Sequence, residues 1–126
     1  MKIAEASKAS GLSADTLRYY ERVGLLSNVT RNDSGIRDYG EQDMLRVQFV
    51  KCMRGAGVSI EALIEYMHLL EQGDETLEAR KALLEEQRDL VQQRIETMQT
   101  GLDRLNYKID NYDKTIRAAE KKLRES

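Results

Sequence analysis

Arginine and tyrosine side chains recur in the first third of the chain at spacings suited to binding an anion. Arg18 and Arg22 are four residues apart, so on a helix they share a face, with Tyr19 beside them. Guanidinium and phenol groups are hydrogen-bond donors that suit phosphate oxygens. Leu17 and Tyr20 fall on the opposite stripe, where we expect core packing. The pattern predicts a helix that packs with one face and presents donors to DNA with the other.

A second group of donors surrounds a predicted turn. The stretch Asn32-Asp33-Ser34-Gly35 contains four turn-forming residues, and Gly35 suits a positive φ. Arg37 and Tyr39 are two residues apart, so on a strand they point to the same face, with Arg31 across the hairpin. We therefore expect two short strands that form a hairpin, or wing, with phosphate-binding chemistry of its own.

Short helices must position these side chains. Small and apolar residues at helical spacing begin at Ile3, and Gly11 suits the C-cap of that helix. Ser13 is a typical N-cap for a second helix that ends near Gly24, so the two helices form a helix-turn-helix. Helical periodicity returns at residue 41, a further helix follows Ser59, and residue 73 ends this region.

The remainder, residues 74–123, predicts one very long helix. Its apolar residues recur as a heptad, broken early by Lys81 and Arg88 and regular from Val91 to Leu123. We expect the dimerisation seam to comprise Val91, Ile95, Met98, Leu102, Leu105, Ile109, Tyr112 and Ile116. A seam of this length needs a partner helix, and a coiled coil with a second copy is favoured over an amphipathic helix folded back on its own head.

Composition limits the classes of function. The 126 residues carry a net charge of −2, and residues 1–72 hold nine Lys and Arg against ten Asp and Glu. A DNA-binding face must therefore come from local clustering, with the acidic residues turned away from it. Neither a signal peptide nor a membrane span is expected, and one cysteine forms no internal disulfide, so we expect a reducing cytoplasm.

The order of these motifs resembles one family. The string R-Y-Y-E-x-x-G-L-L followed by a G-x-R-x-Y wing is similar to the head of MerR-family regulators, over residues 2 to 71. The resemblance implies a mainly α fold with a winged helix-turn-helix head, residues 1–72, and a dimerisation helix, residues 74–123. It also implies a homodimer whose tails pair antiparallel on a pseudo-palindromic promoter. Such regulators bend and undertwist an overlong promoter spacer, which brings its two RNA polymerase recognition elements into line.

Carried onto this chain, the resemblance implies a set of DNA-binding residues. Ser13 and Thr16 would lie near the groove, Arg18 and Tyr19 would bind phosphates, and the wing would be anchored by its own donors. The full candidate set is Ser13, Thr16, Arg18, Tyr19, Arg22, Arg31, Arg37 and Tyr39. Gly40 departs from the expected pattern, because Ser or Thr would cap the next helix better.

The candidate sensor is Cys52. With one cysteine and one histidine the chain has no tetrahedral metal set, and we expect neither metal nor cofactor. The run from Phe49 to Ser59 resembles the cysteine-bearing helix of the NmlR/AdhR-type subgroup, whose members respond to reactive aldehydes and other electrophiles through a single thiol. Lys51 and Arg54 would favour the thiolate. The alternative is a buried cysteine that packs in the core.

Other classes of function remain in view. The chain could be a coiled-coil adaptor whose head binds protein, or a MerR-like regulator without thiol sensing. An enzyme is not expected, because the sequence has no Gly-rich phosphate loop and no recognisable catalytic set.

Overall fold

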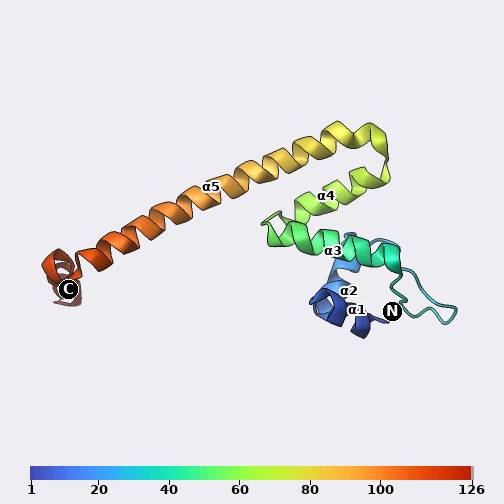
Figure 1. Cartoon of the computed structure of the whole chain (residues 1–126), viewed down its shortest axis with the longest axis horizontal. Helices are drawn as coiled ribbons and strands as arrows, with labels where there is room; N and C mark the ends of the chain where they lie inside the picture. The colour runs from blue at the N-terminus through green and yellow to red at the C-terminus, as the bar shows by residue number, and fades with distance from the viewer. Residues whose placement is uncertain (126) are drawn as a thin grey trace. The chain divides into compact units, whose positions relative to one another are not determined.

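The computed structural model describes residues 1–125, and its regular elements are helical (Figure 1). The first four helices are α1 (Ile3–Ser10), α2 (Ala14–Arg22), α3 (Glu41–Gly55) and α4 (Ile60–Glu71). They are followed by the 3₁₀ turn η1 (Asp74–Thr76), α5 (Leu77–Asp110), the π-helical segment η2 (Tyr112–Ile116) and α6 (Arg117–Glu125). The chain forms two compact units, Met1–Asp89 and the residues from Leu90 onward. The expected mainly α class is confirmed.

Local capping residues set the ends of the first two helices. Gly11 adopts φ 79° and its N–H donates to Ser7 O, which closes α1 at the expected residue. The Ser13 hydroxyl accepts a hydrogen bond from Thr16 N at 3.0 Å and caps α2. Gly24 then adopts φ 94° where α2 was expected to stop. The helix-turn-helix predicted from the sequence is confirmed.

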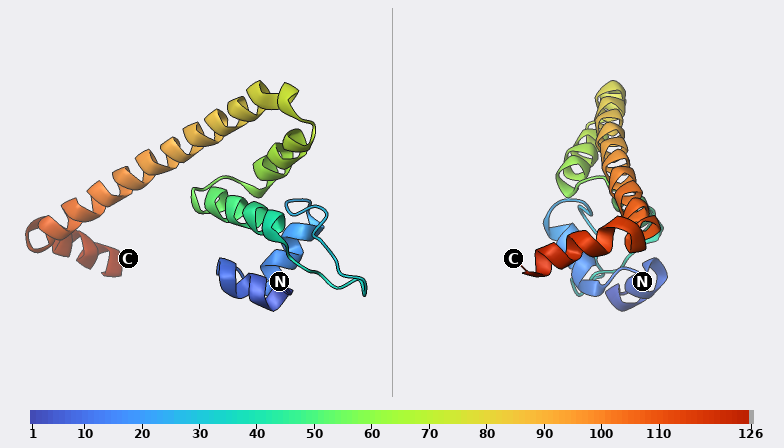
Figure 2. Two further views of the ribbon diagram at one scale, coloured as in Figure 1. Left: turned by 45° about the vertical axis from the view of Figure 1, so that its right-hand side comes forward. Right: turned by 90° about the vertical axis from the view of Figure 1, so that its left-hand side faces the viewer.

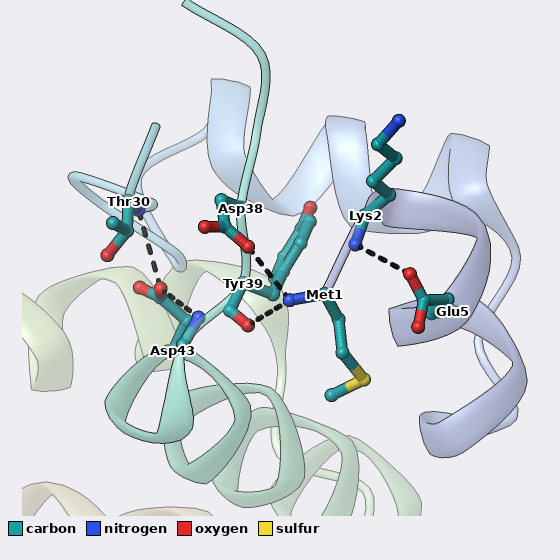
Figure 3. A network of polar contacts seen from close by, with 8 residues as sticks. Met1, Lys2, Glu5, Thr30, Asp38, Tyr39 and Asp43 are labelled. Atoms are coloured by element: carbon teal, nitrogen blue, oxygen red, sulfur yellow. Dashed lines mark hydrogen bonds and ion pairs between the residues drawn. The ribbon is translucent and has the colours of Figure 1, made fainter. Parts of the chain in front are cut away.

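The third and fourth helices begin in different ways. Ser59 caps α4 as predicted, because its hydroxyl accepts from Ala62 N at 3.1 Å. Gly40 has no side chain with which to cap α3, and Asp43 compensates by accepting from Gly40 N at 2.9 Å. The same carboxylate accepts from Thr30 N at 3.4 Å (Figure 3). Asp43 therefore ties the start of α3 to the wing.

A single apolar core holds the first unit together. In Figure 1 and in the left view of Figure 2, α1 and α2 lie on one side of α3, and α4 lies on the other. Leu17 and Tyr20 are buried, as their place on the inner stripe of α2 predicted. The core comprises Ala6, Leu17, Tyr20, Leu25, Leu26, Val29, Tyr39, Val47, Val50, Val58, Ala62, Leu63 and Met67.

The wing is a hairpin with less strand structure than expected. Asn32 Oδ1 accepts from Ser34 N and Ile36 N, and Gly35 adopts φ 78°, so the predicted turn is confirmed. A single antiparallel bridge pairs Arg31 with Arg37, and the described residues contain no longer strand. The prediction of two short strands is wrong in this respect. Backbone bonds from Asn32 N to Ile36 O and from Asp38 N to Thr30 O join the two arms, and the side-chain bonds to Asn32 hold the turn between them.

The first turns of α5 belong to the same compact unit as the head. Gln87 is 6% exposed and Leu83 packs against the core, whereas the heptad residue Leu77 is 57% exposed. The inner stripe of this segment therefore differs from the heptad stripe, which accounts for the charged breaks at Lys81 and Arg88. Residue 73 marks a turn with φ 98°, but the compact unit extends beyond it to Asp89.

The expected uninterrupted helix to residue 123 is wrong. α5 ends at Asp110, and Asn111 O accepts hydrogen bonds from Lys114 N, Thr115 N and Ile116 N. The amide of Asn111 also donates to Tyr107 O at 2.9 Å, and these local bonds replace the regular helical pattern. Tyr112 and Ile116 consequently lie beyond α5 and outside the heptad register assigned to them.

The chain reverses after α5. Lys108 Nζ lies 3.1 Å from Glu120 Oε2, although twelve residues of continuous helix would separate the two by about 18 Å. The Tyr112 hydroxyl also bonds to Glu120. The predicted seam residues from Val91 to Ile109 remain on one helix, and five of these six are at least half exposed: Ile95, Met98, Leu102, Leu105 and Ile109.

No helix in residues 1–125 is long and apolar enough to cross a membrane.

Candidate nucleic-acid interface

The outward face of α2 carries the predicted donors. Arg18 is exposed and its Nη1 lies 3.0 Å from Asp15 Oδ1. The guanidinium of Arg22 lies over the Tyr19 ring, 5.3 Å from its centroid, which is a cation–π contact. Tyr19 is 36% exposed. These side chains share one face, as the spacing predicted. Arg18 is held by Asp15, and Arg22 is held by the Tyr19 ring.

The two hydroxyl candidates lie at the N-terminus of α2. Ser13 is exposed and Thr16 is half-buried, and Ser13 Oγ donates to Thr16 Oγ1 at 2.9 Å. In the structure Ser13 caps the helix, and Thr16 supplies the backbone N–H that Ser13 binds. The positive end of the helix dipole and the free backbone N–H groups lie at the same end, which suits an anionic partner.

The wing arginines meet one carboxylate of α2. Arg31 Nη2 lies 3.0 Å from Glu21 Oε2, and Arg37 Nε lies 2.5 Å from Glu21 Oε1. Arg31 Nη1 also donates to Gly35 O at 3.1 Å. The hydrogen bond from Glu21 raises the pKa of Arg37, so this guanidinium stays charged.

Four cationic side chains line one open cavity of about 490 Å³ between the start of α1, α2 and the wing. Three of them, Arg18, Arg31 and Arg37, were predicted from the sequence, and the structure brings them together. The fourth is Lys2, which the sequence reasoning did not include. Lys2 immediately precedes α1, and the N-terminus of a helix attracts anions. This position could have indicated from the sequence that Lys2 belongs to an anion-binding group.

Tyr39 lies differently from the prediction. The sequence placed it beside Arg37 on one face of the wing, among the phosphate-binding candidates, but it is 2% exposed and its hydroxyl has no hydrogen-bond partner in the described part of the chain. Burial raises the pKa of the phenol. Its backbone is held by Met1, whose amino group donates to Tyr39 O at 2.8 Å and to Asp38 Oδ1 at 2.9 Å (Figure 3). The ring therefore packs in the core, and a contact between the Tyr39 hydroxyl and DNA stays a prediction.

Acidic residues were expected to face away from the donors, and this expectation is also wrong. Asp15 pairs with Arg18, and Glu21 joins both wing arginines. The near-neutral charge of the head is thus distributed as ion pairs within the same face. Glu21 belongs to the motif that carried the family resemblance, but its partners are ten and sixteen residues away, so the contact could not be predicted from local spacing.

Cys52 is a free and exposed thiol on α3. It does not pack in the core. Its two basic neighbours are occupied by backbone carbonyls, since Lys51 Nζ donates to Ser10 O and Arg54 Nη1 donates to Val58 O at 2.7 Å. Within the described residues, no group of three or more His, Cys, Asp or Glu is placed to hold a metal ion.

Comparison with known proteins identifies the family. A model of the MerR helix-turn-helix regulatory proteins matches residues 1–70, and a second model, for the MerR DNA-binding region, matches residues 44–107. The chain belongs to the MerR family of transcription regulators. The resemblance noted in the string from Arg18 to Leu26 is therefore confirmed.

Individual relatives agree with this assignment. The regulator AdhR of Bacillus subtilis (strain 168) is 62% identical over 84 residues, which are 67% of this chain and 60% of AdhR. The chain thus spans less than two thirds of the length of this curated relative. A MerR-family regulator from Listeria monocytogenes is 50% identical, with a TM-score of 0.82 over 99% of this chain and 95% of the other. HiNmlR, a MerR-family regulator that lacks the sensor domain and was crystallised on promoter DNA, is 33% identical with a TM-score of 0.75 over 92% of each chain. All three are regulators rather than enzymes.

Proposed function

We propose that this MerR-family chain binds promoter DNA through α2 and the wing. The observation that carries the proposal is the cavity lined by Lys2, Arg18, Arg31 and Arg37. Four cations converge on one opening in a chain whose net charge is −2, as a phosphate backbone requires. HiNmlR, which shares the fold, binds promoter DNA, and this supports the same role here.

Within this proposal, α2 enters the major groove. The N-terminal residues of a recognition helix contact base edges, and Ser13 and Thr16 occupy that position in α2. Arg18, Tyr19 and Arg22 contact the backbone on either side, and Arg31 and Arg37 hold the wing on an adjacent phosphate. Phosphate contacts orient the head, and base contacts supply specificity.

The active species in this proposal is a homodimer. An exposed apolar stripe on α5 is costly in water, and the stripe from Val91 to Ile109 suits a second copy of the same helix. Antiparallel pairing places two heads on a pseudo-palindromic site. The dimer distorts the promoter and thereby controls RNA polymerase, and a chain with a free thiol suits a reducing cytoplasm.

Footprinting on the DNA upstream of the gene, followed by titration at several salt concentrations, tests DNA binding. We expect a protected inverted repeat and an affinity that falls steeply with salt. Arg18→Ala should weaken binding to all duplexes and lower the salt slope by about one unit. Arg88→Ala is the matched control, because Arg88 is also an exposed arginine in an ion pair but lies on α5.

Two results would argue for a different role. The absence of any duplex binding would favour the adaptor that binds protein through its head. A loss of folding in Arg18→Ala would mean that Arg18 is structural rather than a phosphate ligand.

We infer that the protein has a second role, as a sensor of small electrophiles such as aldehydes, and that Cys52 is the reacting residue. The supporting observation is its exposure on α3, because a thiol must be reachable in order to react. AdhR, named above, belongs to the subgroup that the run from Phe49 to Ser59 resembles. The test of this role is given in the Discussion.

A further inference from the structure

Glu21 occupies an unfavourable place for a protein that binds phosphate. Its two oxygens contact one wing arginine each, Oε1 with Arg37 Nε and Oε2 with Arg31 Nη2. A carboxylate among phosphate-binding groups repels the DNA backbone, and this cost rises as water is excluded. A favourable contribution of Glu21 must therefore offset this repulsion.

The exposed fractions of Glu21 and its two arginine partners indicate what this contribution is. The Glu21 side chain is 18% exposed, against 27% for Arg37 and 44% for Arg31. Glu21 is thus the most buried of the three side chains, and both arginines that it contacts are more accessible to solvent. The contact therefore holds the two arginines in place while it leaves them reachable from solvent.

The contacts leave each guanidinium with donors to spare. Arginine has five N–H donors, and the contact to Glu21 uses the Nε–H of Arg37, so its two terminal nitrogens are available to another acceptor. The backbone bridge between Arg31 and Arg37 brings two like charges to neighbouring positions. Glu21 offsets their mutual repulsion and fixes both side chains before DNA arrives.

We propose that Glu21 is a positioning residue of the DNA interface, which joins Arg31 and Arg37 into one rigid two-pronged phosphate clamp attached to α2. This inference rests on the proposed function. Glu21 acts through the arginines and contacts no DNA itself. The base-contacting residues also lie on α2. Glu21 therefore fixes the distance between these residues and the phosphate-binding arginines of the wing.

Glu21→Gln tests the proposal, because it removes the charge and keeps the size. Two short duplexes serve as probes, the footprinted promoter site and a scrambled duplex of equal composition. Binding then has to order two flexible side chains that Glu21 had fixed, so the variant should bind the promoter site about tenfold more weakly. Binding to the scrambled duplex should weaken less, because it depends on phosphate contacts alone and not on the spacing between the clamp and the base-reading residues. Glu65→Gln, on the exposed face of α4, is the control that removes one charge away from the clamp.

Two outcomes would overturn the proposal. Equal tightening on both duplexes would make Glu21 a simple unfavourable charge. An unchanged promoter affinity with a lowered melting temperature would make it a stability residue only. Wild-type protein that binds neither duplex would instead contradict the proposed function, and this result is distinguishable because it appears before any substitution.

A double-mutant cycle supplies an independent readout that a purely structural role would not give. If Glu21 acts through the clamp, Glu21→Gln should no longer weaken promoter binding when Arg31 and Arg37 are both replaced by Gln. An effect of full size in that background would overturn the assignment. Glu21→Asp keeps the charge but shortens the arm by one methylene, so it should lose affinity to a smaller degree, and it remains available if the Gln variant does not fold.

Discussion

Gln87 Oε1 accepts a hydrogen bond from the backbone N–H of Ser59 at 3.2 Å, across 28 residues of sequence. The contact joins the first turns of α5 to the residue that caps α4, and the Gln87 side chain is 6% exposed. A half-buried backbone N–H that loses its acceptor destabilises the fold. The pair therefore links the start of α5 to the head.

Gln87→Leu should destabilise the protein by about 1–2 kcal/mol, because it leaves Ser59 N–H without a partner while keeping most of the side-chain volume. Urea unfolding followed by circular dichroism, at one fixed protein concentration, measures the change. Gln93→Leu is the control, since Gln93 is exposed on the same helix and should change stability by less than about 0.5 kcal/mol. An equal loss in both variants would show that the hydrogen bond contributes nothing.

The dimer should depend on the exposed stripe of α5. Leu102→Lys combined with Ile109→Lys places two charges in the seam, where burying an unpaired charge is unfavourable. Analytical ultracentrifugation should then report monomers, and promoter binding should collapse. Gln93→Lys with Thr100→Lys adds the same charge on the opposite side of α5 and should leave the dimer intact. A seam double variant that remains fully dimeric would contradict the register.

The reversal after α5 should respond to acid. The hydrogen bond from Tyr112, and then the pairing with Lys108, lower the pKa of Glu120 from its ordinary 4.5. The contribution of Glu120 is thus complete above pH 4.5 and is lost as pH falls through the lowered pKa. An NMR titration of the Glu120 carboxyl should show a midpoint below 4.5 that moves upward in Tyr112→Phe. A Glu120 midpoint that does not move in Tyr112→Phe would contradict the contact.

Local signals in the sequence predicted the head well. The helix-capping residues are Gly11, Ser13 and Ser59. Each contacts a backbone group within four residues of itself, so its capping role can be predicted without knowledge of the fold. The turn at Asn32 is equally local. The inner stripe of α2 was also predictable, since helical periodicity alone separates Leu17 and Tyr20 from the donors.

Contacts between distant residues were not predictable. The heptad of apolar residues continues through Tyr112 and Ile116, so the pattern gives no sign that Asn111 ends α5. The break depends on side-chain bonds and on the pair between Lys108 and Glu120, which require the folded tail. The contacts of Glu21 likewise require the hairpin, and total charge suggested the opposite arrangement.

Cys52→Ser tests the sensor role. The serine keeps a similar size and removes the nucleophile, so we expect normal promoter binding but no change in transcription when cells meet an aldehyde. Mass spectrometry of the intact wild-type protein after brief exposure to an aldehyde should show one adduct on Cys52, and the Ser variant should lack it. An unmodified Cys52 together with a full transcriptional response in the variant would end this hypothesis.

Tyr39→Phe tests whether the buried hydroxyl serves DNA binding. In the free protein the hydroxyl has no partner among the described residues, and leaving such a group unpaired costs about 1–3 kcal/mol. Burial raises the pKa of Tyr39 above its ordinary 10.0, so the phenol is a neutral donor near neutral pH. We predict that a DNA phosphate becomes its acceptor when the wing engages the backbone. The variant should then be as stable as the wild type or more so, and should bind promoter DNA several-fold more weakly. Tyr20→Phe removes the hydroxyl of another tyrosine of the same core and should leave affinity unchanged. If Tyr39→Phe binds as tightly as the wild type, Tyr39 is a core residue, and Arg31 and Arg37 remain as the phosphate-binding candidates of the wing.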